Sequence, residues 1–363
     1  MPFFNREENI KQMKAILSGE PNLLWFVYGP INSGKTALLM KVFEELSEEY
    51  RVFYVNFRER DVKTVEDLMR VLFRVKVAES QKISEFLKEI LKGEARIIEK
   101  LGGIPIPENI FDLLFREVKK VEDVFVFLRE YFSILKEEGF RPVFVLDEMQ
   151  TIKEVINVSG KPIIARLFNF LVRLTKETHL CHCLCATSDC LFIEDVYSNA
   201  RLEGRAKYLL VDDLSKEDAF RIYEEFGFED KELIWDYIGG KIGDIVGLHE
   251  EKKRYPEKEA LESMLKNEMA RLEGLLEKIE AGNRRFCFEG KEILVDIEKI
   301  KEVFLKFRER EEISKKEIDP IWRNYLVYEN ILFYNPMEGT VRPQSRLLWR
   351  AIKETVKDLS EKF

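Results

Sequence analysis

Histidine, cysteine and glutamine are scarce in this chain, and long apolar runs are missing. The 363 residues include three histidines and five cysteines. The glutamines are confined to Gln12, Gln81, Gln150 and Gln344. An odd number of cysteines, most of them clustered, argues against a disulfide framework and favours a reducing, cytoplasmic location. No apolar stretch approaches the roughly 20 residues that cross a bilayer, and residues 1–6 lack the features of a signal peptide, so no membrane association is predicted.

The charge and the length of the chain narrow down the class of protein and the number of its domains. Charged residues make up 35% of the sequence and the formal net charge is −8, which argues against a protein coated with nucleic acid but is compatible with a local basic face. Abundant Glu and Lys with so little glutamine resemble proteins adapted to high temperature. With 45% hydrophobic residues and 27 phenylalanines, the chain can bury a sizeable core, and its length indicates two or three domains.

A phosphate-binding motif is the most specific feature of the sequence. Residues 29–36 fit G-x-x-x-x-G-K-[ST], after the apolar run 23–28 and before a helical apolar pattern over 37–46. This strand–loop–helix context distinguishes the motif from an accidental glycine turn. The loop N–H groups are expected to surround an anion at the helix N-terminus, with Lys35 on the β- and γ-phosphates and Thr36 on Mg²⁺. The residues expected to bind ATP or ADP here are Gly29, Pro30, Asn32, Ser33, Gly34, Lys35, Thr36 and Ala37.

Strands that are nearly all apolar alternate with helices over the first 212 residues. The predicted strands are 23–28, 52–57, 141–146, 180–186 and 207–211. Long helical stretches are predicted over 64–136, with a break at 102–107 and a capping box of Thr64 and Asp67, and over 163–175. This alternation predicts an α/β fold, with a parallel five-stranded sheet of the RecA/AAA type covered on both faces.

The pattern changes after Asp213. Ser215 is expected to cap a helix that ends near Gly227, a second helix ends at residues 239–240, and a charged helix covers 257–280. A hairpin of 331–334 and 340–342 and a closing helix from 345 then indicate a winged-helix module. The predicted domains are an ATPase core (1–212), a helical lid (213–285) and a winged-helix-like domain (286–363).

Two acids follow the third predicted strand. Asp147 is expected to hold Mg²⁺, and Glu148 is placed to orient and deprotonate an attacking water. The alternative is a pair of solvated acids at the end of a strand. Nucleoside kinases with a similar loop usually need no water-activating acid, so the pair favours ATP hydrolysis over phosphoryl transfer to a metabolite.

Further polar residues are candidates for contact with the γ-phosphate. Thr187 and Ser188 end the fourth strand, and a hydroxyl there is a candidate sensor of the γ-phosphate or of the water if strands three and four are neighbours. A plain strand-ending turn is the alternative. Arg201 and Arg205 precede the fifth strand, and Arg205 is the stronger candidate for an arginine finger, acting in its own subunit or in a neighbour.

These residues together resemble the archaeal Walker-type ATPases of the STAND/AAA+ branch. The similar motifs are F-x-x-R-E near residues 4–7, D-E-x-Q at 147–150, L-x-G-R at 202–205 and G-G-x-P at 239–242. The resemblance implies a helical lid, a C-terminal winged helix, Asn5 and Arg6 near the adenine, a role for Arg205, and kinship to origin-recognition-type initiators. Ile242 departs from the pattern because it stands where proline is expected, which puts the coupling of lid to nucleotide in doubt.

Two further sets of residues have competing interpretations. Cys181, Cys183 and Cys185 share one face of a strand and are more plausible as core residues than as zinc ligands, which usually come from turns. Basic residues near the C-terminus are candidates for phosphate contacts, although acids lie among them: Arg323, Arg342, Arg346, Arg350 and Lys353.

The sequence thus predicts a Mg²⁺-dependent ATPase that couples its nucleotide state to the positions of the lid and the winged helix. Two alternatives remain, namely a slow nucleotide-switch scaffold and a DNA-binding initiator-like protein. The expected partners are ATP and either a protein or DNA at the C-terminal module. The oligomeric state stays open.

Overall fold

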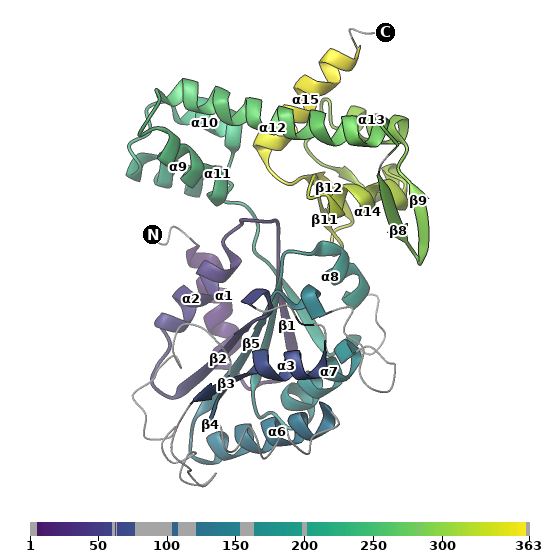
Figure 1. The fold of residues 1–363 in the computed structure, drawn as a ribbon. Coiled ribbons are helices and arrows are strands. Elements are labelled where there is room, and N and C mark those ends of the chain that lie inside the picture. The colour runs from purple at the N-terminus through teal and green to yellow at the C-terminus, as the bar shows by residue number, and fades with distance from the viewer. Residues whose placement is uncertain are drawn as a thin grey trace.

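The computed structural model describes residues 6–59, 62, 64–76, 104–107, 121–152, 163–197, 202–282 and 284–360. In Figure 1 a layer of sheet and helices lies below two further regions, which the long helix α12 (Glu257–Glu280) joins. Within the described residues no helix is long and apolar enough to span a bilayer.

A five-stranded parallel sheet forms the lower region. Its strands are β1 (Leu24–Tyr28), β2 (Tyr50–Asn56), β5 (Arg141–Asp147), β6 (His182–Thr187) and β7 (Ala206–Leu210). Their order is β2-β5-β6-β1-β7, with every pair parallel. The predicted α/β fold is confirmed, and the third and fourth predicted strands are neighbours, which was the condition for placing Thr187 and Ser188 beside the two acids.

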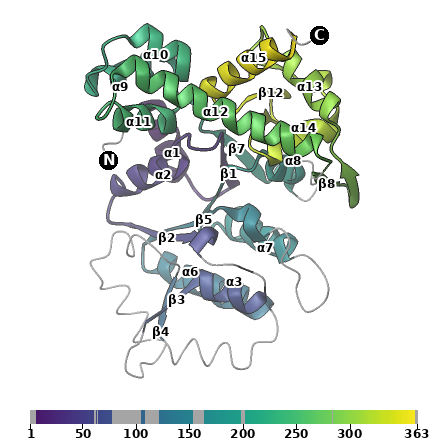
Figure 2. The same ribbon diagram turned by 45° about the horizontal axis from the view of Figure 1, so that its top comes forward.

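Helices cover both faces of this sheet, as the all-apolar strands predict (Figure 2). On one face α1 (Glu7–Ser18) and α2 (Lys35–Glu44) pack against the strands. On the other face lie α3 (Val65–Leu72), α6 (Val121–Glu137) and α7 (Ile163–Val172). The side chains of residues 181, 183 and 185 are buried on this second face, which confirms their prediction as core cysteines.

The prediction of helical structure over 64–136 is wrong in part. The capping box of Thr64 and Asp67 is present and starts α3. The helix ends at Leu72, however, and β3 (Phe73–Lys76) pairs in parallel with β4 (Ile104–Pro107). This pairing joins segments that are about 30 residues apart, so local periodicity does not reveal it. The remainder of the expected helix before residue 121 lies outside the described residues.

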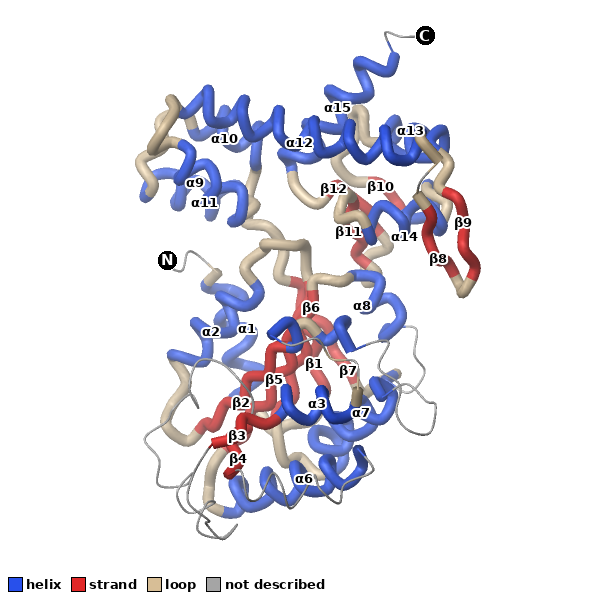
Figure 3. The backbone as a smooth tube through the Cα atoms, viewed as in Figure 1, coloured by secondary structure: helices blue, strands red, loops and turns tan. Residues whose placement is uncertain are grey.

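Four helices follow the sheet and form the region predicted as a lid. They are α9 (Lys216–Glu225), α10 (Lys231–Ile238), α11 (Ile242–Glu251) and the first half of α12. The Ser215 hydroxyl caps α9 by accepting from the N–H of Asp218, as expected. Figure 3 shows α12 continuing from this region to the C-terminal one. Its first half packs with the lid cluster and its second half packs elsewhere, so the predicted boundary at 285/286 stays a prediction.

The C-terminal region combines three helices with small antiparallel sheets. Its elements are β8 (Arg285–Phe288), β9 (Lys291–Leu294), α13 (Ile297–Lys306), β10 (Ile313–Ser314), α14 (Pro320–Tyr328), β11 (Leu332–Asn335), β12 (Thr340–Pro343) and α15 (Arg346–Ser360). The expected hairpin is confirmed as β11 and β12, and β10 pairs with β12 to make a three-stranded sheet. The β8–β9 hairpin was not expected.

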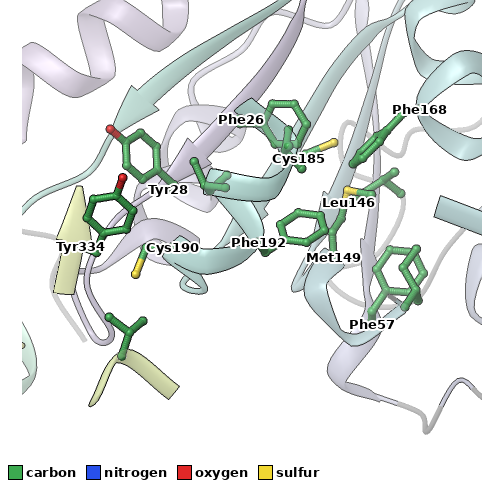
Figure 4. Packing of buried hydrophobic residues seen from close by; sticks show 14 of the residues in the cluster. Phe26, Tyr28, Phe57, Leu146, Met149, Phe168, Cys185, Cys190, Phe192 and Tyr334 are labelled. Atoms are coloured by element: carbon green, nitrogen blue, oxygen red, sulfur yellow. The ribbon is translucent and has the colours of Figure 1, made fainter. Parts of the chain in front are cut away.

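This C-terminal region packs on the sheet region next to the end of β1. Strand β11 lies on α8 (Cys190–Tyr197), and Tyr28, Cys190 and Tyr334 belong to one buried cluster. Figure 4 shows these three side chains side by side. The hydroxyl of Tyr28 also donates to Oδ1 of Asn335 at 2.9 Å. The contact therefore combines apolar burial with specific hydrogen bonds.

Candidate nucleotide-binding site

The loop 29–36 connects the end of β1 to the start of α2. Gly34 is the N-cap of α2 and has no side chain to cap it, so the first N–H groups of the helix remain available to an anion. Gly29 lies against the chain that leaves β7, because a Cβ at this position would be 2.1 Å from the carbonyl oxygen of Val211. Only glycine fits this approach, which fixes where the loop begins.

Lys35 is the first residue of α2 and is buried, with 7% of its side chain exposed. Its Nζ donates to the carbonyl oxygens of Gly29 (3.1 Å) and Pro30 (2.8 Å) in its own loop. Burial lowers the pKa of Lys35 to about 8, a shift that the nearby Glu148 carboxylate opposes. The ammonium is thus poorly solvated, and an anion in the loop would satisfy it.

The metal ligands predicted from the sequence lie together. Thr36 Oγ1 donates to Oδ2 of Asp147 at 2.9 Å, which joins the start of α2 to the end of β5. The hydroxyl of Tyr54 on β2 donates to the same carboxylate oxygen. A hydroxyl beside a carboxylate offers hard oxygen ligands of the kind that Mg²⁺ prefers. The residues present therefore fit a magnesium ion.

Glu148 has a different set of partners from Asp147. Its φ of +60° is unusual for a non-glycine residue, and its N–H donates to the carbonyl oxygen of Ala186 on β6 at 2.9 Å. The carboxylate pairs with Arg58 at 3.1 Å and accepts from Nε2 of Gln150 at 2.5 Å. Burial raises the pKa of Glu148, and both partners oppose that rise.

The hydroxyl-bearing end of β6 joins this network. Thr187 Oγ1 donates to Oε1 of Gln150 at 2.6 Å and accepts from the N–H of Asp189 at 3.0 Å. Gln150 therefore bridges Thr187 and Glu148. Ser188 follows at the same strand end, and its proposed role at the γ-phosphate stays a prediction.

Arg205 is not brought to this site. Its carbonyl oxygen accepts from the N–H of Leu24 at 3.0 Å, at the start of β1, whereas Lys35 follows the end of that strand. A role for Arg205 in its own subunit is therefore wrong, because the length of the strand separates it from the loop. A role in a neighbouring subunit stays a prediction. Arg201 and Asn5 lie outside the described residues.

Arg6 lies between the loop and the segment after β7. Its guanidinium donates to the carbonyl oxygen of Ser33, and to that of Asp212 at 2.7 Å. A cavity of about 410 Å³ opens beside it, toward the start of α9. Charged and polar residues dominate its lining: Arg6, Glu7, Glu8, Asn9, Asp212, Asp213, Ser215, Asp218 and Arg221.

The lid touches the loop directly. At Gly240 a Cβ would be 1.9 Å from the carbonyl oxygen of Leu214, so the second glycine of the pair lets the chain pass close to the segment that leads into α9. Ile242 is the first residue of α11, the helical position that proline favours. Its Cδ1 lies 3.3 Å from where a Cβ at Gly34 would be, and Gly243 packs on Asn32. Ile242 therefore keeps the lid helix against the loop where the family pattern has proline.

Several residues of this site were not found from the sequence. Tyr54 and Arg58 carry no motif, and their roles depend on the pairing of β2 with β5. Lys241 of the lid is buried, pairs with Asp213 at 3.4 Å and donates to the backbone oxygen of Gln344. Only Gln150 carried a signal, because it ends the D-E-x-Q motif.

Comparison with known proteins identifies the family of the chain. Residues 3–248 match the family model of the ATPase domain predominantly from Archaea. The chain belongs to this ATPase family. Residues 258–356 match a second family model, the C-terminal domain of the uncharacterized ATP-binding protein MJ1010-like family.

Full-length relatives exist in Methanocaldococcus jannaschii. The uncharacterized ATP-binding protein MJ0147 is 43% identical over 371 residues, covering 98% of each chain. The uncharacterized ATP-binding protein MJ0801 is 39% identical, covering 97% of this chain and 99% of the relative. Among solved structures, the ORC2 protein of Aeropyrum pernix is 15% identical, with a TM-score of 0.46 and coverage of 100% of this chain and 96% of that one.

Proposed function

We propose that this chain is an ATP-binding, Mg²⁺-dependent ATPase that hydrolyses ATP to ADP and phosphate. The observation that carries the proposal is the 2.9 Å contact of Thr36 with Asp147, next to the buried Lys35. A phosphate loop, a hydroxyl and a strand-end carboxylate meet there at the carboxyl edge of a parallel sheet. The naming of the relatives as ATP-binding proteins supports the choice of nucleotide.

Each residue has a role that its surroundings support. The loop N–H groups and Lys35 bind the phosphates, and Thr36 and Asp147 hold the metal. Mg²⁺ bound with ATP supplies charge neutralisation at the phosphates. Glu148 accepts a proton from water, and burial favours this because it raises the pKa of the carboxylate.

The cavity beside Arg6 is proposed as the site of the base and ribose. Its carboxylates, from Asp212, Asp213 and Asp218, would repel phosphates but can accept hydrogen bonds from ribose hydroxyls and an exocyclic amino group. The phosphates are then directed toward Lys35. This arrangement places the nucleotide between the sheet region and the lid.

A slow nucleotide switch is the second candidate, and the contacts of Glu148 favour it. Arg58 and Gln150 both contact Oε2 of Glu148 and lower the pKa of its carboxyl, which weakens it as a base. A weaker base removes a proton from water less readily, so turnover is expected to be slow. The switch and the enzyme then differ in rate and use the same residues.

We also propose that the C-terminal domain is a winged helix, because helix, strand, helix and hairpin follow one another in that order. The basic residues suggested there as phosphate contacts have partners within the chain. Arg323 pairs with Glu194, Arg342 with Asp212, Arg346 with Glu311 and Arg350 with Asp236, while Lys353 lies over the ring of Trp349. In the docked arrangement Arg323, Arg342 and Arg350 support contacts between domains, which favours a nucleotide-controlled protein module over direct DNA binding.

Steady-state ATP hydrolysis tests the proposal. The change Glu148→Gln should lower the rate about 100-fold or more, the usual contribution of a general base, while calorimetry still shows ATP binding. The exposed lid residue Glu225 provides the matched control, and Glu225→Gln should leave the rate unchanged. Equal rates for wild type and Glu148→Gln would remove Glu148 from this role.

A further inference from the structure

The peptide unit between Pro30 and Ile31 connects Lys35 to the C-terminal domain. On one side the carbonyl oxygen of Pro30 accepts from Nζ of Lys35 at 2.8 Å. On the other side the N–H of Ile31 donates to Oε1 of Gln344 at 3.3 Å. Because a peptide unit is planar and rigid, a rotation that changes one of these bonds changes the other.

Gln344 is fixed firmly within its own domain. It lies between β12 and α15 and is buried, with 7% of its surface exposed. Its backbone N–H donates to the carbonyl oxygen of Ile331 at 3.0 Å, and its Nε2 donates to that of Leu332 at 3.1 Å. Its own carbonyl oxygen accepts from Nζ of Lys241 in the lid. One residue therefore contacts the phosphate loop, the lid and the C-terminal domain.

We propose that Gln344 is a positioning residue through which the occupancy of the phosphate loop controls docking of the C-terminal domain. This inference rests on the proposed binding of ATP. To reach a triphosphate, Lys35 must leave the carbonyl oxygen of Pro30. The Pro30 oxygen then keeps its longer hydrogen bond from the N–H of Ser33, at 3.3 Å, but loses the charged donor that polarises the peptide unit most. The bond from this peptide unit to Gln344 therefore weakens. ATP binding therefore loosens the domain.

Two other docking contacts do not pass through the loop. Tyr28 bonds to Asn335 at 2.9 Å, and Arg323 pairs with Glu194 at 2.8 Å. Neither contact involves a carbonyl oxygen that Lys35 binds. Their loss should loosen docking to the same extent with and without nucleotide, which separates them from Gln344.

Cys190 is a native reporter of docking, because it is buried in α8 next to Tyr334 (Figure 4). Of the other cysteines, three are buried in the sheet region, and Cys287 is exposed. In a Cys287→Ser background, the rate at which a thiol reagent labels Cys190 measures how often the C-terminal domain lifts away. The labelled residue is identified by mass spectrometry.

A non-hydrolysable ATP analogue with Mg²⁺ should raise the Cys190 labelling rate about three- to tenfold, the effect of losing one hydrogen bond. The change Gln344→Leu should give fast labelling with or without the analogue. The matched control Tyr28→Phe deletes one docking hydrogen bond outside the loop, so it should raise both rates and keep their ratio. Gln344→Glu retains an acceptor for Ile31 but loses the donor to Leu332, so it should raise both rates and keep their ratio, which provides a readout if the leucine variant does not fold.

A nucleotide response that survives in Gln344→Leu would overturn the inference. An unchanged labelling rate in wild-type protein that binds the analogue by calorimetry would overturn it too, and would leave the proposed ATP binding intact. Absence of binding heat in folded protein would instead refute the proposed function itself.

Discussion

Asp244 in the first turn of the lid helix α11 should destabilise the protein at neutral pH. Its Oδ2 is buried and has no hydrogen-bond partner within the described part of the chain. Burial raises the pKa of Asp244 to about 6, although the nearby ammonium of Lys241 acts in the opposite direction. The native protein therefore binds a proton at this carboxyl more tightly than the unfolded chain does.

The sign and size of the effect follow from this difference. Between the unfolded pKa of 3.8 and the folded value of about 6, stability falls as pH rises, because the unfolded chain releases this proton while the folded protein still holds it. A difference of about two units between the folded and unfolded pKa corresponds to about 3 kcal/mol of stability, at 1.36 kcal/mol per unit. The change Asp244→Asn removes this charge and should raise the free energy of unfolding by about 1–3 kcal/mol at about pH 7.5, and by much less near pH 4.

Urea unfolding followed by circular dichroism at the two pH values measures the effect. The exposed lid residue Asp236 pairs with Arg350 and offers a control, since Asp236→Asn should slightly destabilise the protein, by less than about 1 kcal/mol. If Asp244→Asn gave the same change at both pH values, or destabilised the protein at neutral pH, the account of a destabilising buried carboxylate would be refuted.

Three further predictions concern the nucleotide site. Because burial lowers the pKa of Lys35 to about 8, calorimetry should show weaker ATP binding as pH rises through that value. Arg58→Ala removes a charge that lowers the pKa of Glu148, so the acidic limb of the pH–rate profile should move to higher pH. An unmoved limb would show that the contact with Arg58 does not set the pKa of Glu148. Tyr54→Phe deletes a donor to Asp147 and should raise the Mg²⁺ concentration for half-maximal hydrolysis about tenfold, and an unchanged requirement would contradict the metal assignment.

The sheet was predictable because its strands are short apolar runs with clear ends. All five matched the expected segments, and the capping box at Thr64 marked the start of α3 correctly. The pairing of β3 with β4 was missed, since it depends on contacts distant in sequence. The β8–β9 hairpin has a turn at Glu289 and Gly290, both with positive φ. Such a glutamate gives a much weaker signal than Asn-Gly does.

The candidate site was predictable where a motif specifies it. Lys35, Thr36, Asp147 and Glu148 follow from spacing, and the structure brings their side chains to one edge of the sheet. Contacts between domains follow no local rule. Nothing near Gln344 in the sequence indicates that its side chain meets the phosphate loop, because only the docking of the C-terminal region creates that contact.

Isothermal titration calorimetry of the pure protein with ATP and Mg²⁺ tests the central claim most directly. The account predicts a saturable heat of binding for wild type that is lost in Lys35→Ala, with both proteins folded by circular dichroism. Folded wild-type protein that gives no heat with either adenine or guanine triphosphates in the presence of Mg²⁺ would contradict it.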